Sequence, residues 1–179
     1  MGKERGVVEI GAGNGQWARA LTERYKTALQ TGTIQHPKKK FDFVLAYDDQ
    51  SELPLDGNMF NKRTQVYHDY FYDKVKYCDP NNFSNTLRQF QCRGRVLLLV
   101  YPPPGNMALD AVKQYASASD MNDTVIYVGE GRGGANANDG LFRYFEENGW
   151  ILLDVMKVIP LGSKGYESLY ILRRQGVGK

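Results

Sequence analysis

A short apolar strand that runs directly into three glycines constrains this chain more than any other feature. The run Val7–Ile10 is typical of a buried strand, and Gly11, Gly13 and Gly15 follow it at alternate positions. The next residues, from position 16, place apolar side chains at helical spacing. Because glycine lets the backbone turn tightly and approach a ligand closely, the pattern predicts a strand, a ligand-binding loop and a helix in succession.

The spacing of these glycines excludes two familiar phosphate-binding loops. A dinucleotide fingerprint needs a third glycine three residues after the second, where this chain has Gln16. A Walker A loop is also absent, because no Gly-Lys-Ser or Gly-Lys-Thr follows. Glu9, at the end of the strand, would repel a pyrophosphate and attract a ligand that carries an ammonium and a sulfonium. S-adenosylmethionine carries both groups, so the loop indicates this cofactor.

The rest of the chain alternates between strand and helix patterns. Apolar runs predict strands at 43–47, 95–101 and 124–128, and helical spacing predicts helices at 16–29, 107–117 and 139–148. Asn138 is the candidate cap of the last helix. Segments 75–78 and 83–90 predict a short strand and a helical crossing. No helical segment separates the last two strands, expected at 150–159 and 166–172, so they should form an antiparallel pair.

This order predicts a mostly parallel sheet that helices cover on both faces. Ligands of such sheets bind outside the carboxyl ends of the strands. That edge would gather the glycine loop, Asp48, Asp79, and the loops at 101–105 and 129–134. The length of 179 residues suits one domain over 1–179, with an irregular insertion at 50–74 that we expect near the substrate side.

Composition indicates a globular protein of ordinary charge. Hydrophobic residues make up 42% of the chain, and the net charge of +3 is too small to imply nucleic-acid binding by itself. Cys78 and Cys92 are too few for a zinc site or a disulfide framework, so we expect no metal site and a reducing compartment, with a redox pair as the weaker alternative.

The chain also lacks the patterns of membrane and secreted proteins. No run reaches the roughly 18 apolar residues of a membrane span, and the first residues lack the apolar core of a signal peptide. We therefore expect a soluble intracellular protein, in the cytoplasm or an organelle, with no membrane partner. Because the first strand begins almost at Met1, the sequence leaves open that the chain is a trimmed form of a longer protein.

The stretch V-V-E-I-G-A-G-N-G resembles the first motif of class I S-adenosylmethionine-dependent methyltransferases. The order of the other elements is similar to that family over nearly the whole chain. The resemblance implies an α/β fold, a seven-stranded Rossmann-like sheet that is mostly parallel, with helices on both faces and a C-terminal antiparallel hairpin. A looser resemblance is to uncharacterised methyltransferase-like proteins that combine a Pro-Pro loop with Y-V-G-E-G after strand five.

The resemblance implies roles for particular residues. The glycine loop would contact the methionine part of the cofactor, an acid after strand two the ribose hydroxyls, and an acid after strand three the adenine amine. The loop after strand four would face the methyl group. The corresponding cofactor-binding residues here are Glu9, Gly11, Gly13, Gly15, Asp48 (with Asp49 as the alternative), Asp79, Tyr101 and Pro102.

The proline loop at 101–104 departs from the family pattern. Methyltransferases that act on amine nitrogens often carry N-P-P-Y or D-P-P-Y at this place, where the first residue accepts hydrogen bonds from the amine. This chain has Tyr101 at the first position and Pro104 at the last. The resemblance therefore does not extend to methylation of base nitrogens, and the methyl acceptor stays open.

Three residues are candidates for a catalytic role. Tyr101 would help to shape the methyl pocket, and Glu130, among glycines after strand five, could accept a proton or orient a substrate. His68 lies among tyrosines in the 50–74 insertion and has the right ordinary pKa for a general base. The ordinary alternatives are a rigid strand exit for the first, a surface salt pair for the second and an exposed polar residue for the third.

Three functional hypotheses follow. The leading one is methyl transfer from S-adenosylmethionine to an unknown acceptor by direct displacement, which demands positioning more than acid–base chemistry. The alternative is a catalytically inactive methyltransferase-like module that binds RNA or protein in a larger assembly, suggested by the altered proline loop and by the short sequence before strand one. A nucleotide-dependent oxidoreductase is disfavoured by Glu9 and the glycine spacing.

Overall fold

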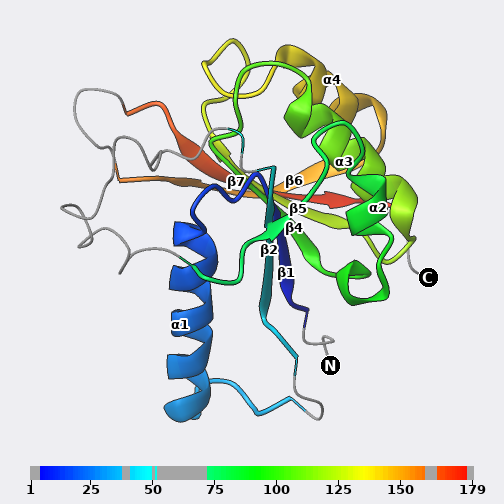
Figure 1. Ribbon diagram of the computed structural model, residues 1–179. Coiled ribbons are helices and arrows are strands. Elements are labelled where there is room, and N and C mark those ends of the chain that lie inside the picture. The colour runs from blue at the N-terminus through cyan, green and yellow to red at the C-terminus, as the bar shows by residue number, and fades with distance from the viewer. Residues whose placement is uncertain (1–4, 38–40, 50, 52–71, 160–164, 177–179) are drawn as a thin grey trace, which may run out of the picture.

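The computed structural model describes residues 5–37, 41–49, 51, 72–159 and 165–176 (Figure 1). His68 and most of the 50–74 segment lie outside these residues, so their predicted roles stay predictions. The elements in chain order are β1 (Val7–Ile10), α1 (Gln16–Gln30), β2 (Val44–Asp48), β3 (Lys76–Tyr77), α2 (Ser84–Leu87), β4 (Val96–Val100), α3 (Met107–Ala118), β5 (Thr124–Gly129), α4 (Asp139–Glu147), β6 (Trp150–Lys157) and β7 (Ser168–Arg174).

These strands form one seven-stranded sheet in the order β3-β2-β1-β4-β5-β7-β6. The first five strands in this order pair in parallel, and β7 pairs antiparallel with both β5 and β6. The predicted fold class is therefore confirmed, including the C-terminal antiparallel hairpin. From β1 the sheet extends to β2 and β3 on one side and to β4 and β5 on the other, so the carboxyl end of β1 is the switch point where open sheets bind ligands.

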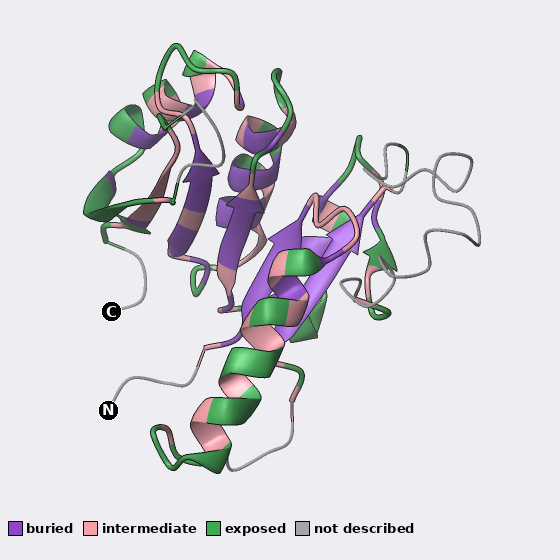
Figure 2. Cartoon of the chain, turned by 90° about the vertical axis from the view of Figure 1, so that its left-hand side faces the viewer, coloured by how far each residue is buried: buried purple, intermediate pink, exposed green. Residues whose placement is uncertain are grey.

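The sheet separates two apolar layers because its strands are buried on both faces. One layer joins Val8, Ile10 and Leu97 to side chains of α3 and α4, and the other joins Val7 and Val44 to Ala18 of α1. Figure 1 accordingly shows α1 on one side of the sheet and α3 and α4 on the other. In Figure 2 the central strands are buried while the outer face of α1 is exposed.

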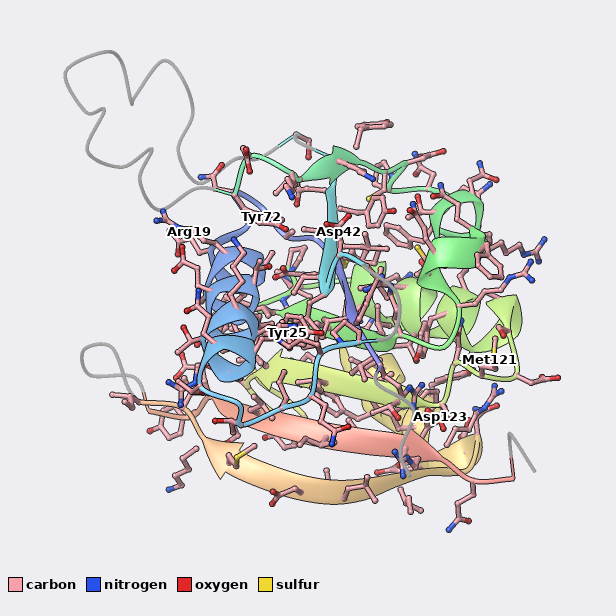
Figure 3. All side chains as sticks on the ribbon, turned by 90° about the horizontal axis from the view of Figure 1, so that it is seen from below. Arg19, Tyr25, Asp42, Tyr72, Met121 and Asp123 are labelled. Carbon is pink, nitrogen blue, oxygen red and sulfur yellow. The ribbon has the colours of Figure 1, made fainter. Side chains whose placement is uncertain are left out.

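An aromatic stack fixes the far end of α1 against the sheet. The rings of Tyr25 and Phe43 lie parallel with their centroids 4.2 Å apart, and Phe41 meets Tyr25 edge-on. Figure 3 shows Tyr25 directed from α1 toward the start of β2. This stack therefore holds the C-terminal half of α1 against the start of β2.

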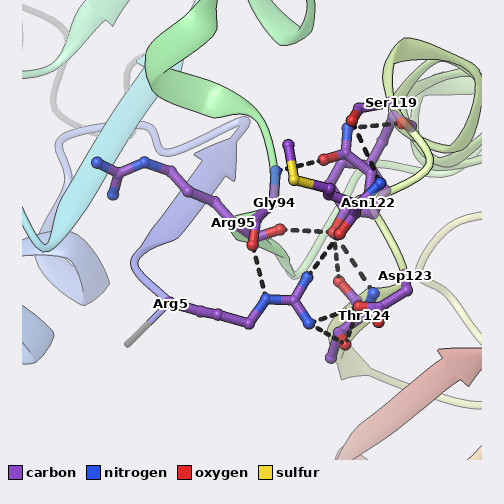
Figure 4. Close-up of polar contacts among 9 residues, drawn as sticks. Arg5, Gly94, Arg95, Ser119, Asn122, Asp123 and Thr124 are labelled. Carbon is purple, nitrogen blue, oxygen red and sulfur yellow. Dashed lines mark hydrogen bonds and ion pairs between the residues drawn. The ribbon is translucent and has the colours of Figure 1, made fainter. Parts of the chain in front are cut away.

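Polar side chains tie together the opposite, amino-terminal edge of the sheet (Figure 4). The Arg5 guanidinium donates to the carbonyls of Gly94 and Met121 at 2.6 and 2.9 Å, and to Oδ1 of Asp123 at 2.5 Å. The side chain of Asn122 accepts from the Gly94 amide at 2.7 Å. These contacts join the start of β1 to the segments that lead into β4 and β5.

One predicted element is shorter than expected. The helical crossing predicted at 83–90 is helical only over α2, and a separate 3-10 helix follows at Phe90–Cys92. The Gln89 backbone between them is extended, with φ −59° and ψ 141°, which ends the first helix. In α4 the predicted cap is confirmed, because the Asn138 side chain accepts from the Leu141 amide at 3.1 Å. Within the described residues, no helix has the length and apolarity that a membrane crossing needs.

Candidate functional site

A cavity of about 780 Å³ lies at the carboxyl ends of β1, β2 and β4. This is the edge at which sequence analysis placed the ligand. The residues that line it are Glu9, Gly11, Ala12, Gly13, Asn14, Gln16, Trp17, Asp48, Asp49, Ser51, Cys78, Pro80, Phe83, Val100, Tyr101, Pro103, Met107 and Asp110. Of the predicted cofactor residues, the cavity thus brings together Glu9, Gly11, Gly13, Asp48 and Tyr101.

The glycine loop takes a shape that side chains would oppose. Gly13 has a φ of 54°, and a Cβ on Gly11 would lie 2.6 Å from the Met107 methyl carbon. The amides of Gly11 and Ala12 both donate to the Tyr47 carbonyl, at 2.9 and 3.0 Å. These bonds bend the chain out of β1 and across the end of β2, so the loop backbone forms one wall of the cavity.

Asp48 joins the end of β2 to this loop. Its Oδ2 accepts from the Gly13 amide at 2.7 Å, and the residue is buried. The neighbouring Asp49 takes a different role, because its Oδ1 accepts from the amide and hydroxyl of Ser51 at 3.0 and 2.8 Å. Both acids line the cavity, and Asp48 is the one that orders the glycine loop.

Glu9 is the most deeply buried acid of the cavity, with 1% of its surface exposed. Burial raises the pKa of Glu9 to about 8, the Ala18 amide opposes this rise, and the nearby Asp48 carboxylate adds to it. Its Oε2 has no hydrogen-bond partner among the described residues. A buried carboxyl oxygen without a partner is costly, so Glu9 is a site prepared for a cationic or donating ligand.

Asn14 supplies the opposite kind of group. Its Nδ2 is buried and has no hydrogen-bond partner within the described part of the chain. Asn14 lines the same cavity as Glu9, from the loop that follows the strand of Glu9. The cavity therefore holds both an unsatisfied acceptor and an unsatisfied donor, a combination that fits a zwitterionic ligand.

The backbone of the proline loop is strained where it enters the cavity. Tyr101 has a φ of 46°, which a bulky side chain rarely adopts, and its amide donates to the Val128 carbonyl at 2.8 Å. Pro102 is buried, and its carbonyl accepts from the Ala137 amide at 3.3 Å. A strained conformation persists only where the surrounding structure holds it, so the position of Tyr101 at the cavity is fixed. Strain of this kind concentrates at functional sites.

Several predicted residues do not line the cavity. Gly15 is instead the N-cap residue of α1. Pro102 is buried, and its carbonyl bonds the Ala137 amide. The Asp79 carboxylate accepts from the Asn81 amide at 2.9 Å, while its neighbours Cys78 and Pro80 line the cavity. The Glu130 carboxylate accepts from the Ala135 amide at 2.7 Å and so closes its own loop.

Sequence reasoning missed part of the cavity wall. Asn14 could have been predicted as a binding residue, because it lies within the glycine motif, where a side-chain amide can reach a ligand. Phe83 comes from the residue before α2, and Met107 and Asp110 come from α3; only the packing of these segments brings them to β1. The described lining contains the acids Glu9, Asp48, Asp49 and Asp110 and no lysine, arginine or histidine, so its electrostatic potential favours a cationic ligand.

No family model and no curated protein sequence matches the chain. Solved structures match it in fold. Sp1610 of Streptococcus pneumoniae, a candidate tRNA (m1A22) methyltransferase in complex with S-adenosyl-L-methionine, matches with a TM-score of 0.56 at 11% identity, over 98% of this chain and 69% of that one. TrmK of M. capricolum, in complex with S-adenosyl-homocysteine, matches with a TM-score of 0.50 at 6% identity over 98% of this chain.

A third structure with bound S-adenosyl-homocysteine, the magnesium protoporphyrin IX methyltransferase ChlM of Synechocystis PCC 6803, matches with a TM-score of 0.50 at 14% identity, over 97% of this chain and 76% of that one. The present chain spans only 64% of the length of TrmK. Identities this low establish the fold and leave the activity to be argued from the site. The strand order, the loop after β1 and these structures together show that the chain has the class I methyltransferase fold.

Proposed function

We propose that the cavity binds S-adenosylmethionine and that the protein transfers its methyl group to an acceptor by direct displacement. The observation that carries this proposal is the pair of unpartnered buried atoms, Oε2 of Glu9 at the end of β1 and Nδ2 of Asn14 in the glycine loop that follows. The methionine part of the cofactor offers an ammonium and a carboxylate, which are the partners that these two atoms need. The cavity volume lies within the roughly 300–1,000 Å³ range of ligand sites.

The other residues of the cavity extend this assignment. The Asp48 carboxylate, fixed by the Gly13 amide, is our candidate for the ribose hydroxyls, with Asp49 beside it as the alternative. Cys78, Pro80 and Phe83 form an apolar wall that suits a flat base. Asp79 stays a proposal for the adenine amine, although its carboxylate is engaged with the Asn81 amide.

Catalysis in this proposal rests on positioning. S-adenosylmethionine supplies an activated methyl group, so the protein has to hold the acceptor in line with it and exclude water. Tyr101, in its strained conformation at the cavity wall, is the catalytic candidate that we retain. Glu130 is the weaker candidate, since its carboxylate binds its own loop. The acceptor itself is unassigned; RNA, protein and small molecules are all compatible with the fold.

The domain organisation belongs to the same proposal. We infer that residues 1–179 form one methyltransferase-like domain, supported by the single sheet that joins β1 to β7. We also infer that the 50–74 segment contributes to substrate choice. At its start, Ser51 and the preceding Asp49 line the cavity. Near its end, Tyr72 lies beside the glycine loop, because its amide donates to the Asn14 carbonyl at 2.9 Å.

Calorimetric titration with S-adenosylmethionine and S-adenosylhomocysteine tests the binding half of the proposal. We expect both to bind the wild-type chain, and Gly13→Arg and Asp48→Ala to abolish or strongly weaken binding. The matched controls are Gly32→Arg, at a glycine of similar φ with open space around it, and Asp120→Ala, at an exposed acid outside the cavity. A folded wild-type chain that binds neither compound would overturn the proposal.

Turnover is a separate measurement. Transfer of a labelled methyl group to RNA, protein and small-molecule fractions should occur with the wild-type chain and fail with Asp48→Ala. Cofactor binding without transfer to any fraction would favour the alternative hypothesis, an inactive module in a larger assembly.

A further inference from the structure

A second cavity, of about 310 Å³, lies on the α3–α4 side of the sheet, between α4 and the strands β5, β7 and β6. It shares no lining residue with the first cavity. Aromatic side chains dominate its wall: Tyr127, Phe142, Phe145, Trp150 and Tyr170. The proposed methyl transfer uses none of them.

The aromatic wall is well ordered. Tyr127 and Phe142 meet edge to face at a centroid distance of 5.7 Å, and Phe145 and Trp150 do so at 5.5 Å. Tyr127, Phe145 and Trp150 are each at least 94% buried. Leu152, which also lines the cavity, is 54% exposed, so the cavity is open to solvent on that side. The rings therefore frame a preformed space rather than a loosely packed patch.

Trp150, one of the lining residues, carries a buried polar group. Its indole Nε1 is buried and has no hydrogen-bond partner among the described residues. A buried tryptophan N–H usually finds an acceptor, so this one is prepared to donate to something outside the described chain. The hydroxyl of Tyr127 cannot serve as a second free donor, because it already donates to the Glu130 carbonyl at 2.8 Å.

Charged side chains lie at the solvent side of the cavity. Arg132 and Glu146 form an ion pair at 2.8 Å, and both side chains are exposed. Because the pair is neutral overall, it favours neither an anion nor a cation inside. The occupant should therefore be uncharged, with its polarity concentrated in one hydrogen-bond acceptor.

We propose that this aromatic cavity is a second binding site, for a planar, mostly apolar small molecule of about two fused rings that carries one hydrogen-bond acceptor for Trp150. Its volume is at the lower end of ligand sites, too small for a second nucleotide cofactor. The proposal does not depend on cofactor binding in the first cavity, so the two can fail separately.

Quinoline and naphthalene test the proposal, because they have the same shape and only quinoline has a ring nitrogen that accepts a hydrogen bond. The chain has two tryptophans, Trp17 and Trp150, so its NMR spectrum holds two indole N–H resonances that a Trp17→Phe variant assigns. We expect quinoline to shift the Trp150 resonance saturably. Naphthalene should bind about five- to tenfold more weakly, the worth of one hydrogen bond between neutral groups.

Two variants make the test specific. Leu152→Phe adds a ring at a half-exposed lining position and should block both compounds while the chain stays folded. Trp150→Phe keeps the aromatic wall and should remove the preference for quinoline, as measured by calorimetry. A Trp150 resonance that neither compound shifts, or equal affinity for both compounds, would overturn the proposal. So would a concentration-dependent shift without any compound, since a second copy of the chain would then cover the site.

Discussion

The two edges of the sheet bury polar side chains for opposite purposes. At the amino-terminal edge, the Arg5 guanidinium makes hydrogen bonds to Gly94, Asp123, Thr124 and Met121. At the carboxyl-terminal edge, Glu9 is buried and keeps one carboxyl oxygen unpaired within the described structure. Each nitrogen of the Arg5 guanidinium thus has a hydrogen-bond partner, whereas Glu9 has a carboxyl oxygen whose partner is still to be supplied.

This difference indicates how the fold divides its tasks. A buried polar group that is fully paired orders the segments around it, whereas an unpaired one destabilises the free protein until a ligand binds. Substitutions at the amino-terminal edge should therefore change stability and leave cofactor binding intact. Substitutions of the cavity acids at the carboxyl-terminal edge should change cofactor binding.

The largest expected effect is at Arg5. Arg5→Ala should lower the free energy of unfolding by about 3 kcal/mol, because it leaves Asp123 and two carbonyls without their partly buried donor. Chemical denaturation measures this loss. The control Arg19→Ala removes an exposed ion pair with Glu23 and should cost about 0.5 kcal/mol or less. A small loss at Arg5, equal to that at Arg19, would contradict the division between the edges.

The next effect concerns Glu9 and pH. Since burial raises the folded pKa of Glu9 to about 8, above its value in the unfolded chain, the folded state prefers the protonated form. The stability that this gives is complete below the unfolded pKa and is lost as the pH rises through the folded pKa. Between about pH 6 and about pH 8, the free energy of unfolding should fall by about 2 kcal/mol more in the wild type than in Glu9→Gln.

Denaturation curves at several pH values give that comparison directly. Using Glu9→Gln as the reference cancels the contributions of all other titrating groups. Parallel pH profiles for the two proteins would show that Glu9 is already ionised in the folded protein. They would contradict the proposal that Glu9 becomes charged when it binds the cofactor ammonium.

A pair of glycine substitutions separates backbone strain from lack of space. Gly15 and Gly32 have φ values of 74° and 70°, but a Cβ on Gly15 would lie 2.6 Å from that of Tyr72, whereas nothing lies within 4 Å at Gly32. Gly32→Ala should destabilise the protein by about 1 kcal/mol from strain alone. Gly15→Ala should cost about 1 kcal/mol more, because the α1 terminus and the segment at Tyr72 must separate. Equal losses in thermal denaturation would show that the contact at Tyr72 is not tight.

The smallest effect in energy is also the most local. Asp48→Asn keeps the size of the side chain but removes the negative charge that the Gly13 amide binds and that we assign to the ribose. Cofactor affinity should fall about tenfold, with stability nearly unchanged. Asp49→Asn is the matched variant, and a larger loss of affinity there would transfer the ribose role to Asp49.

Local sequence patterns predicted most of the fold, because each element carries its own signal. The glycine loop marked the end of β1, the Pro-Pro run marked the end of β4, and Asn138 marked the start of α4, where its side chain caps the helix. The helix predicted at 83–90 was wrong in its extent, since the break at Gln89 depends on how the chain returns to β4.

The site was less predictable than the fold. Strand ends gave Glu9, Gly11, Gly13 and Asp48, because residues at the carboxyl edge of a parallel sheet must converge. The side chains that complete the wall, such as Phe83 before α2 and Met107 of α3, are brought there by helix packing that no short pattern encodes. Sequence also could not show that Glu130 closes its own loop, because that requires the fold of residues 130–135.

Proton release on cofactor binding tests the central claim most directly. S-adenosylmethionine is titrated into the protein at about pH 7 in phosphate and in Tris, whose ionisation heats differ, so the difference in binding heat counts the protons released. If Glu9 is protonated in the free protein and meets a cation on binding, the wild type should release about one proton more than Glu9→Gln. Equal proton release by the two proteins would contradict the account.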